Sequence, residues 1–118
     1  MRQKLIEVLK QFGDPVRLQG SLNPEDGYPD SFWTFWVNDI PEAGHYDNVP
    51  SGYVWHFWVY YYSIDAEQVE TVSLLAKRRL QEAGFTVPGK PVDAASDRKT
   101  HTGVMFAVQI LEHYKEEV

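Results

Sequence analysis

Two aromatic-rich runs, residues 32–37 and 53–62, dominate the hydrophobic pattern of this chain and contain all four of its tryptophans. Both runs are short, rich in β-branched and aromatic residues, and bounded by Pro, Gly, Asn or Asp, which is typical of β-strands. Their apolar residues fall at odd and even positions alike, so both faces of each strand need cover. We expect the runs to pair as an antiparallel hairpin with the long loop 38–52 between them.

Helical spacing of apolar residues predicts two helices, at about 2–12 and 66–83. The second helix has the clearer boundaries. Asp65 is the expected N-cap, and Gln68 stands three residues later as its capping-box partner. Gly84 follows the last apolar position of the stripe and is placed to end the helix in a Schellman motif.

Three further segments complete the predicted sheet. Residues 16–20 alternate as a short strand, 91–94 fit an edge strand, and 103–112 form a strand that is apolar on both faces. The tail 113–118 is polar and is predicted to fray. The order α-β-β-β-α-(β)-β predicts one α+β domain over 1–118, with a mostly antiparallel or mixed sheet of about 4-5 strands and the helices on one side.

Two helices cover only one face of such a sheet. We therefore expect another protein chain to cover the second face, which favours an assembly component over an enzyme. Core and interface packing explains the aromatic side chains better than stacking on single-stranded nucleic acid, because neither run contains Lys or Arg. The interface candidates come from the two runs and from the loop between them: Trp33, Phe35, Trp36, His45, Tyr46, Asp47, Asn48, Trp55 and Trp58.

Charge and composition narrow the function classes further. A formal net charge of -6 and a pI of about 5.1 disfavour direct binding of duplex DNA, which usually requires a basic stripe. The absence of cysteine excludes disulfides and zinc–thiolate sites. The first residues lack the apolar centre of a signal peptide, and no apolar run approaches the roughly 20 residues of a membrane helix. We expect a soluble protein of the cytoplasm.

Polar residues in the loop offer one candidate for chemistry. Asp39, His45 and Asp47 could form a metal or acid–base site if their side chains converge. Loop residues of these types more often cap turns and bond the backbone. The sequence contains no nucleophile elbow, phosphate-binding loop or dinucleotide fingerprint. We predict no enzyme activity, and no catalytic, cofactor-binding or metal site.

Several loop-plus-strand strings resemble a known family. The strings are Tyr28-Pro29-Asp30-Ser31-Phe32-Trp33-Thr34-Phe35-Trp36, His45-Tyr46-Asp47-Asn48, Gly52-Tyr53-Val54-Trp55, Gly89-Lys90-Pro91-Val92-Asp93-Ala94-Ala95-Ser96-Asp97 and Thr100-His101-Thr102-Gly103. Together they are similar to small tail-completion proteins of tailed phages and prophages of Gram-positive bacteria, of the tail-terminator or head–tail joining class. The resemblance spans about residues 28–111.

This resemblance implies an α+β subunit, similar to tail terminators, that forms a ring, commonly hexameric, on the tail tube. The implied partners are other copies of the chain and the tail-tube or connector proteins, with no membrane and no sequence-specific nucleic acid. The implied location is the host bacterial cytoplasm during assembly and the virion afterwards. The family supplies no catalytic residue to carry over.

A binding module of a different class is the alternative. In that interpretation the domain holds a small molecule or a peptide in an aromatic pocket lined by Trp33, Trp36, Trp55 and Trp58. A closed cavity would favour this alternative, whereas a flat exposed apolar surface would favour assembly.

Overall fold

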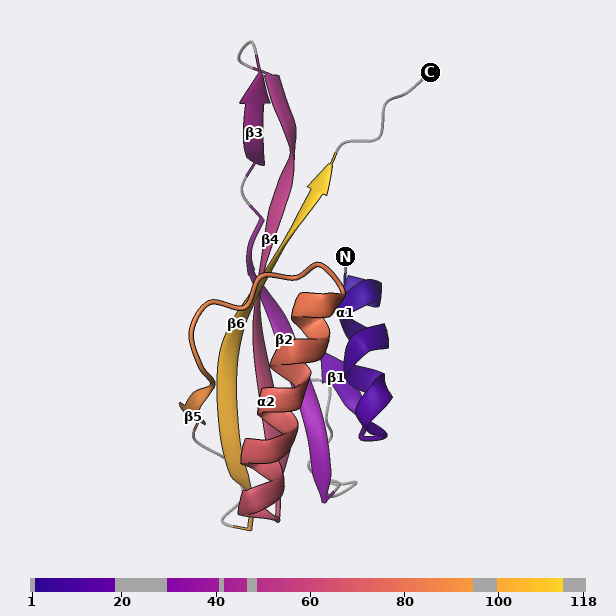
Figure 1. The fold of residues 1–118 in the computed structure, drawn as a ribbon, viewed down its shortest axis with the longest axis vertical. Helices are drawn as coiled ribbons and strands as arrows, with labels where there is room; N and C mark the ends of the chain where they lie inside the picture. Colours follow the sequence, from indigo (N-terminus) through magenta and orange to yellow (C-terminus); the bar gives the residue numbers. More distant parts are fainter. Residues whose placement is uncertain (1, 19–29, 41, 47–48, 95–99, 114–118) are drawn as a thin grey trace.

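The computed structural model describes residues 2–18, 30–40, 42–46, 49–94 and 100–113, which form an α+β domain (Figure 1). This confirms the predicted fold class, two helices and mixed sheet. The elements are, in chain order, α1 (Arg2–Leu9), the 3-10 helix η1 (Lys10–Phe12), β1 (Val16–Leu18), β2 (Ser31–Asp39), β3 (Glu42–Tyr46), β4 (Val49–Ser63), α2 (Ala66–Glu82), β5 (Val92–Ala94) and β6 (Thr102–His113).

The strands form one mixed sheet in the order β1-β2-β4-β6-β5, with β3 paired to β4. β1 runs parallel to β2, and every other pairing is antiparallel. β2 and β3 pair with successive parts of the long strand β4: Asp39 lies opposite His56, and Glu42 lies opposite Tyr53. β2 and β3 therefore follow the same edge of β4, in a hairpin longer than the aromatic runs alone predict.

The prediction of a loop over 38–52 was wrong, because this stretch contains β3 and the beginning of β4. Residues 42–46 read Glu-Ala-Gly-His-Tyr and contain no β-branched residue, so their own strand propensity is low. These residues form a strand because their backbone pairs with the adjoining part of β4. β3 and residues 49–53, which we call the hairpin arm, project beyond the helices (Figure 1) and contribute to a molecule measuring 53 × 28 × 22 Å.

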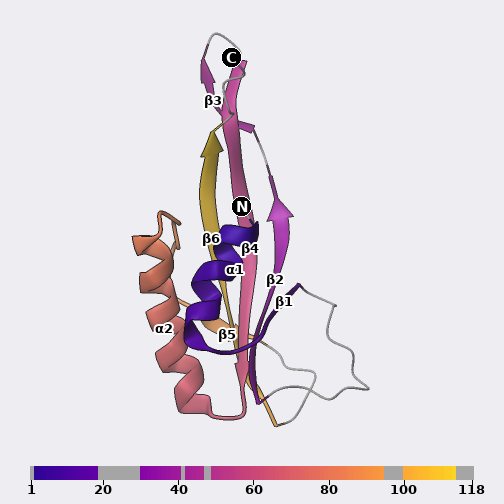
Figure 2. The ribbon, with the colours of Figure 1, turned by 90° about the vertical axis from the view of Figure 1, so that its right-hand side faces the viewer.

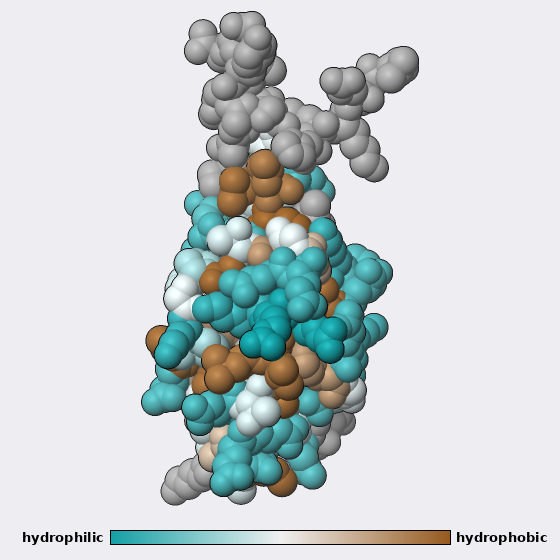
Figure 3. Space-filling model, viewed as in Figure 1, coloured by the Kyte–Doolittle hydropathy of each residue, from teal (hydrophilic) through white to brown (hydrophobic). Residues whose placement is uncertain are grey.

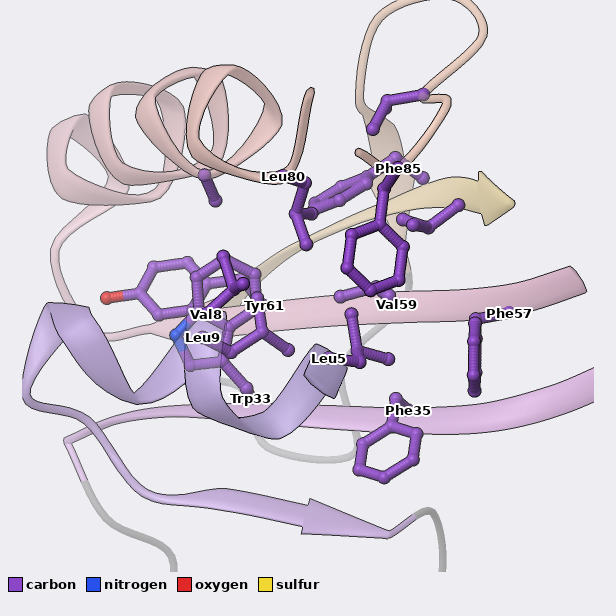
Figure 4. Packing of buried hydrophobic residues seen from close by; sticks show 14 of the residues in the cluster. Leu5, Val8, Leu9, Trp33, Phe35, Phe57, Val59, Tyr61, Leu80 and Phe85 are labelled. Carbon is purple, nitrogen blue, oxygen red and sulfur yellow. The ribbon is translucent and has the colours of Figure 1, made fainter. Parts of the chain in front are cut away.

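Both helices lie on the same face of the sheet (Figure 2). Strand side chains alternate between faces, and those directed at the helices form the core. Phe57, Val59 and Tyr61 of β4 are at most 1% exposed, and Leu5 and Leu80 pack over them from the two helices (Figure 4).

At the N-terminus of α2, Asp65 is the predicted N-cap, but Gln68 is not its capping-box partner. The Asp65 carboxylate accepts the backbone N–H groups of Glu67 at 3.0 Å and Gln68 at 3.3 Å, as an N-cap does. Gln68 does not complete a capping box, because its side-chain amide donates to the Tyr61 hydroxyl at 2.9 Å. The Ser63 hydroxyl instead accepts the Asp65 N–H at 3.1 Å.

The C-terminus of α2 is the predicted Schellman motif. Gly84 has a φ of 97°, a left-handed conformation that favours glycine. The N–H of Phe85 bonds the carbonyl of Leu80 at 2.9 Å, and the N–H of Gly84 bonds that of Gln81 at 3.1 Å. The phenyl ring of Phe85 is consequently folded back into the core, where it is 3% exposed.

Candidate interaction surface

The sheet face turned away from the helices carries the side chains that alternate with the core residues of β2, β4 and β6. We call it the open face. Its register places residues of the three strands side by side, so that Trp36, Trp58 and Ala107 form one cross-strand row. The open face comprises Phe32, Thr34, Trp36, Val54, His56, Trp58, Tyr60, Tyr62, Met105, Ala107, Gln109 and Leu111.

Aromatic rings lie against one another along this face. The rings of Phe32 and Tyr62 are stacked with centroids 5.1 Å apart, and those of Tyr60 and Tyr62 are parallel within 2° at 6.3 Å. Trp36 lies directly opposite Trp58 on the neighbouring strand. These ring contacts fix the orientation of Phe32, Tyr60 and Tyr62, so that this part of the aromatic surface is preformed.

Exposure is uneven along the open face. Phe32 is 4% exposed and Thr34 is 5% exposed, whereas Trp36 is 45% exposed and Leu111 is 42% exposed. The most exposed apolar side chains of the open face therefore lie toward the hairpin arm. Large apolar side chains exposed in a contiguous patch mark interaction sites.

The open face is also electrically neutral in its central three strands. None of its twelve residues is Asp, Glu, Lys or Arg, although the chain carries a net charge of -6. Arg17 of β1 and Asp39, which follows a register shift in β2, stand at its margins. Covering the central area would desolvate no permanent charge, which removes the main penalty of burying a protein surface.

The structure divides the predicted interface residues between the two faces. Trp33 is 0% exposed and Phe35 is 2% exposed, so both are core residues beneath the helices rather than surface contacts. Trp55 also lies on the helix side, where its indole N–H donates to the Glu112 carboxylate at 3.3 Å and it stacks with Phe57 at 5.8 Å. Only Trp36 and Trp58 among the tryptophans lie on the open face, and the four therefore line no common pocket.

The other candidates lie in or beside the hairpin arm. The backbones of His45 and Tyr46 belong to β3 and pair with Pro50 and Val49. The side chains of His45 and Tyr46, and the whole of 47–48, lie outside the described residues. The structure therefore does not describe how the side chains of Asp39, His45 and Asp47 lie relative to one another. In the described ranges no three His, Asp or Glu side chains gather as a metal site would require.

A buried polar network at the other end of the sheet had no counterpart in the sequence interpretation. The Tyr61 hydroxyl donates to Asp14 at 2.9 Å and accepts from Gln68, joining β4 to the segment before β1 and to α2. The hydroxyls of Ser31 and Ser63 lie 2.8 Å apart and tie β2 to β4. Burial, assisted by the Asp14 carboxylate, raises the pKa of Tyr61 to about 12. The network keeps a neutral phenol in place and ties four segments together.

A groove of about 390 Å³ separates α2 from the edge of the sheet at β5. Its walls mix apolar and charged side chains and contain no aromatic residue. They include Val69, Glu70, Leu74, Lys90, Asp93 and Val104.

Comparison with known proteins adds no relative to this picture. No protein-family model matches the chain, and no curated protein matches it. Among the described residues, no helix has the length and apolarity that crossing a membrane requires. The open face and its geometry are therefore the structural basis for a functional proposal.

Proposed function

We propose that this chain is a non-enzymatic structural protein of a tailed phage or prophage, which acts in tail completion or head–tail joining by forming a ring on the tail tube. The observation that carries the proposal is the open face: an uncharged aromatic surface over which no helix of the described residues lies, and on which Trp36 is 45% exposed. The resemblance of the loop-plus-strand strings to tail-completion proteins supplies the biological setting.

In this proposal, the open face is buried by a neighbouring subunit or by the tail-tube protein. Sheet faces pack about 10 Å apart with interdigitating side chains, a geometry that the rows of Trp, Tyr and Met could meet. A stable contact requires about 800 Å² from each partner. Assembly takes place in the host bacterial cytoplasm, and the protein then remains in the virion.

The hairpin arm provides the second contact of the proposed ring. Beyond Gly52, where β4 no longer pairs with β6, the arm is a two-stranded hairpin, and a hairpin of this kind is marginally stable in water. β3 pairs only with β4 in the described sheet, and its remaining edge is free to meet a neighbour. The arm would thus gain order on assembly.

The test is the mass of the protein by light scattering across a concentration series, with and without the tail-tube protein of the same phage. The proposal predicts a discrete ring or a capped tube for the wild-type chain. It also predicts loss of assembly for the double variant Trp36→Ser with Trp58→Ser. Ile64→Ser is the matched control, because Ile64 is 52% exposed but does not belong to the open face. A wild-type chain that stays monomeric with the tube protein, or a double variant that assembles as well as the control, would overturn the proposal.

The groove between α2 and β5 favours one second candidate, a small-molecule or peptide-binding module. Its volume of about 390 Å³ lies within the range of ligand pockets. This candidate predicts that Ala66→Trp, which places a large side chain in the groove from an exposed position, abolishes ligand binding while ring assembly is unaffected. Assembly that fails in the open-face variant but survives in Ala66→Trp would support the structural role.

A further inference from the structure

Helix α2 exposes two adjacent leucines on its outer side. Leu74 is 46% exposed and Leu75 is 45% exposed, whereas Ala76 and Leu80 are fully buried against the sheet. Figure 3 shows hydrophobic surface interrupting the hydrophilic surface where α2 crosses this side of the molecule. With Thr71, these leucines form an apolar stripe opposite the buried stripe of the same helix.

Opposite charges flank this stripe at equal distances. Glu70 lies four residues before Leu74 and Arg78 lies four residues after it, and both are exposed. Eight residues of helix span about 12 Å, so Glu70 and Arg78 are too far apart to pair within one chain. The one ion pair described on α2 joins Arg79 to Glu82 at 3.9 Å and involves neither of them.

We propose that a second copy of this chain binds here, with the two α2 helices antiparallel about a two-fold axis at Leu74. A two-fold axis places each position before Leu74 opposite the equally distant position after it in the partner. Glu70 then faces Arg78 of the partner subunit, and Arg78 faces the partner's Glu70. Leu74 packs against the partner's Leu74 between these two ion pairs, and Thr71 and Leu75 lie at the margin of this contact.

A shallow hollow on α2 and the short length of this helix are consistent with a weak dimer. Glu70, Thr71, Leu74, Leu75 and Arg78 line a shallow hollow of about 340 Å³, into which a partner's leucine side chains can settle. Helix α2 has 17 residues and is about 25 Å long, so one helix pair buries less than a standard interface. We therefore expect a dissociation constant above about 1 μM.

This contact is separate from the proposed ring. Helix α2 lies on one side of the sheet and the open face lies on the other (Figure 2). A two-fold contact whose axis is perpendicular to the ring axis and meets it generates dihedral symmetry, and in that arrangement the two contacts are compatible. Variants in the open face and in α2 therefore test the two proposals independently.

The experiment is sedimentation velocity of the full chain, up to about 1 mM, with charge reversals on α2. Glu70→Arg and Arg78→Glu each convert both ion pairs into like-charge contacts, and each should raise the dissociation constant about tenfold. Combining the two substitutions recreates the pairs in reverse and should restore the wild-type constant within about threefold. Raising the salt to about 1 M should shrink the difference between each single variant and the wild type.

Matched controls come from α1, where Glu7 and Lys10 are exposed. Glu7→Arg and Lys10→Glu change the net charge by the same amounts and should leave the dissociation constant unchanged. Circular dichroism checks that all variants stay folded. A wild-type chain that is monomeric at about 1 mM, single reversals that match the controls, or a double reversal as weak as the singles would each overturn the proposal.

Discussion

Raising the pH should destabilise this domain through Tyr61. The folded-state pKa of Tyr61 is about 12, against an ordinary value of 10.0. The neutral phenol therefore stabilises the fold fully below pH 10, and this contribution disappears as the pH rises toward 12. The difference between the two pKa values corresponds to about 2.7 kcal/mol, of which about 1.4 kcal/mol is lost by pH 11.

The assay is urea unfolding from pH 8 to pH 11.5, with Tyr61→Phe as the reference, so that the two proteins differ only in the Tyr61 hydroxyl. At pH 8 the variant should be less stable by about 1–2 kcal/mol, since Asp14 and Gln68 each lose a hydrogen-bond partner. The wild-type advantage should shrink and then reverse as Tyr61 ionises. Two stability curves that stay parallel from pH 8 to pH 11.5 would refute this account of the polar network.

Four further substitutions test the packing and the helix cap. Leu80→Ala should cost about 2–5 kcal/mol in urea unfolding, because Leu80 is 0% exposed, whereas Leu74→Ala should cost under about 1 kcal/mol. Asp65→Ala should cost about 1 kcal/mol through the lost N-cap, measured in the same way. Gly103→Ala should lower the melting temperature, since the added Cβ would meet the Tyr62 ring at 2.6 Å; an unchanged value would contradict this packing.

The ends of α2 could be predicted from the sequence because they depend on local chemistry. Asp65 caps the helix with its own carboxylate, and Gly84 supplies the left-handed residue of the Schellman motif. The role of Gln68 could not be predicted in this way. Its amide bonds Tyr61 because the end of β4 passes beneath the first turn of the helix, a tertiary contact without a local signature.

The spacing of the four tryptophans is enough to show that they lie on both faces of the sheet. Trp33 and Trp36 are three residues apart, as are Trp55 and Trp58. Within a strand, an odd separation places two side chains on opposite faces, so the four could not line one pocket. Which tryptophan of each pair faces the core is decided by the helices, and this is a property of the assembled fold.

The hairpin arm could not be predicted because its strand structure comes from its partner. Residues 42–46 have weak strand propensity, and Pro50 and Gly52 lie where β4 begins. Their pairing follows from the length of β4, which extends past the helices. A strand is predicted from the sequence by its pattern of side chains. β3 is held instead by backbone pairing with β4, which leaves no such pattern.

The most direct test of the central claim, that the open face is buried on assembly, uses the absence of cysteine from the chain. Leu111→Cys places a single thiol on the open face, where Leu111 is 42% exposed, and Glu7→Cys places one on the outside of α1. The rate of maleimide labelling is measured before and after addition of the tail-tube protein. The account predicts labelling at least about tenfold slower for Leu111→Cys on assembly, and an unchanged rate for Glu7→Cys. Assembly that leaves the labelling of Leu111→Cys as fast as before would contradict it.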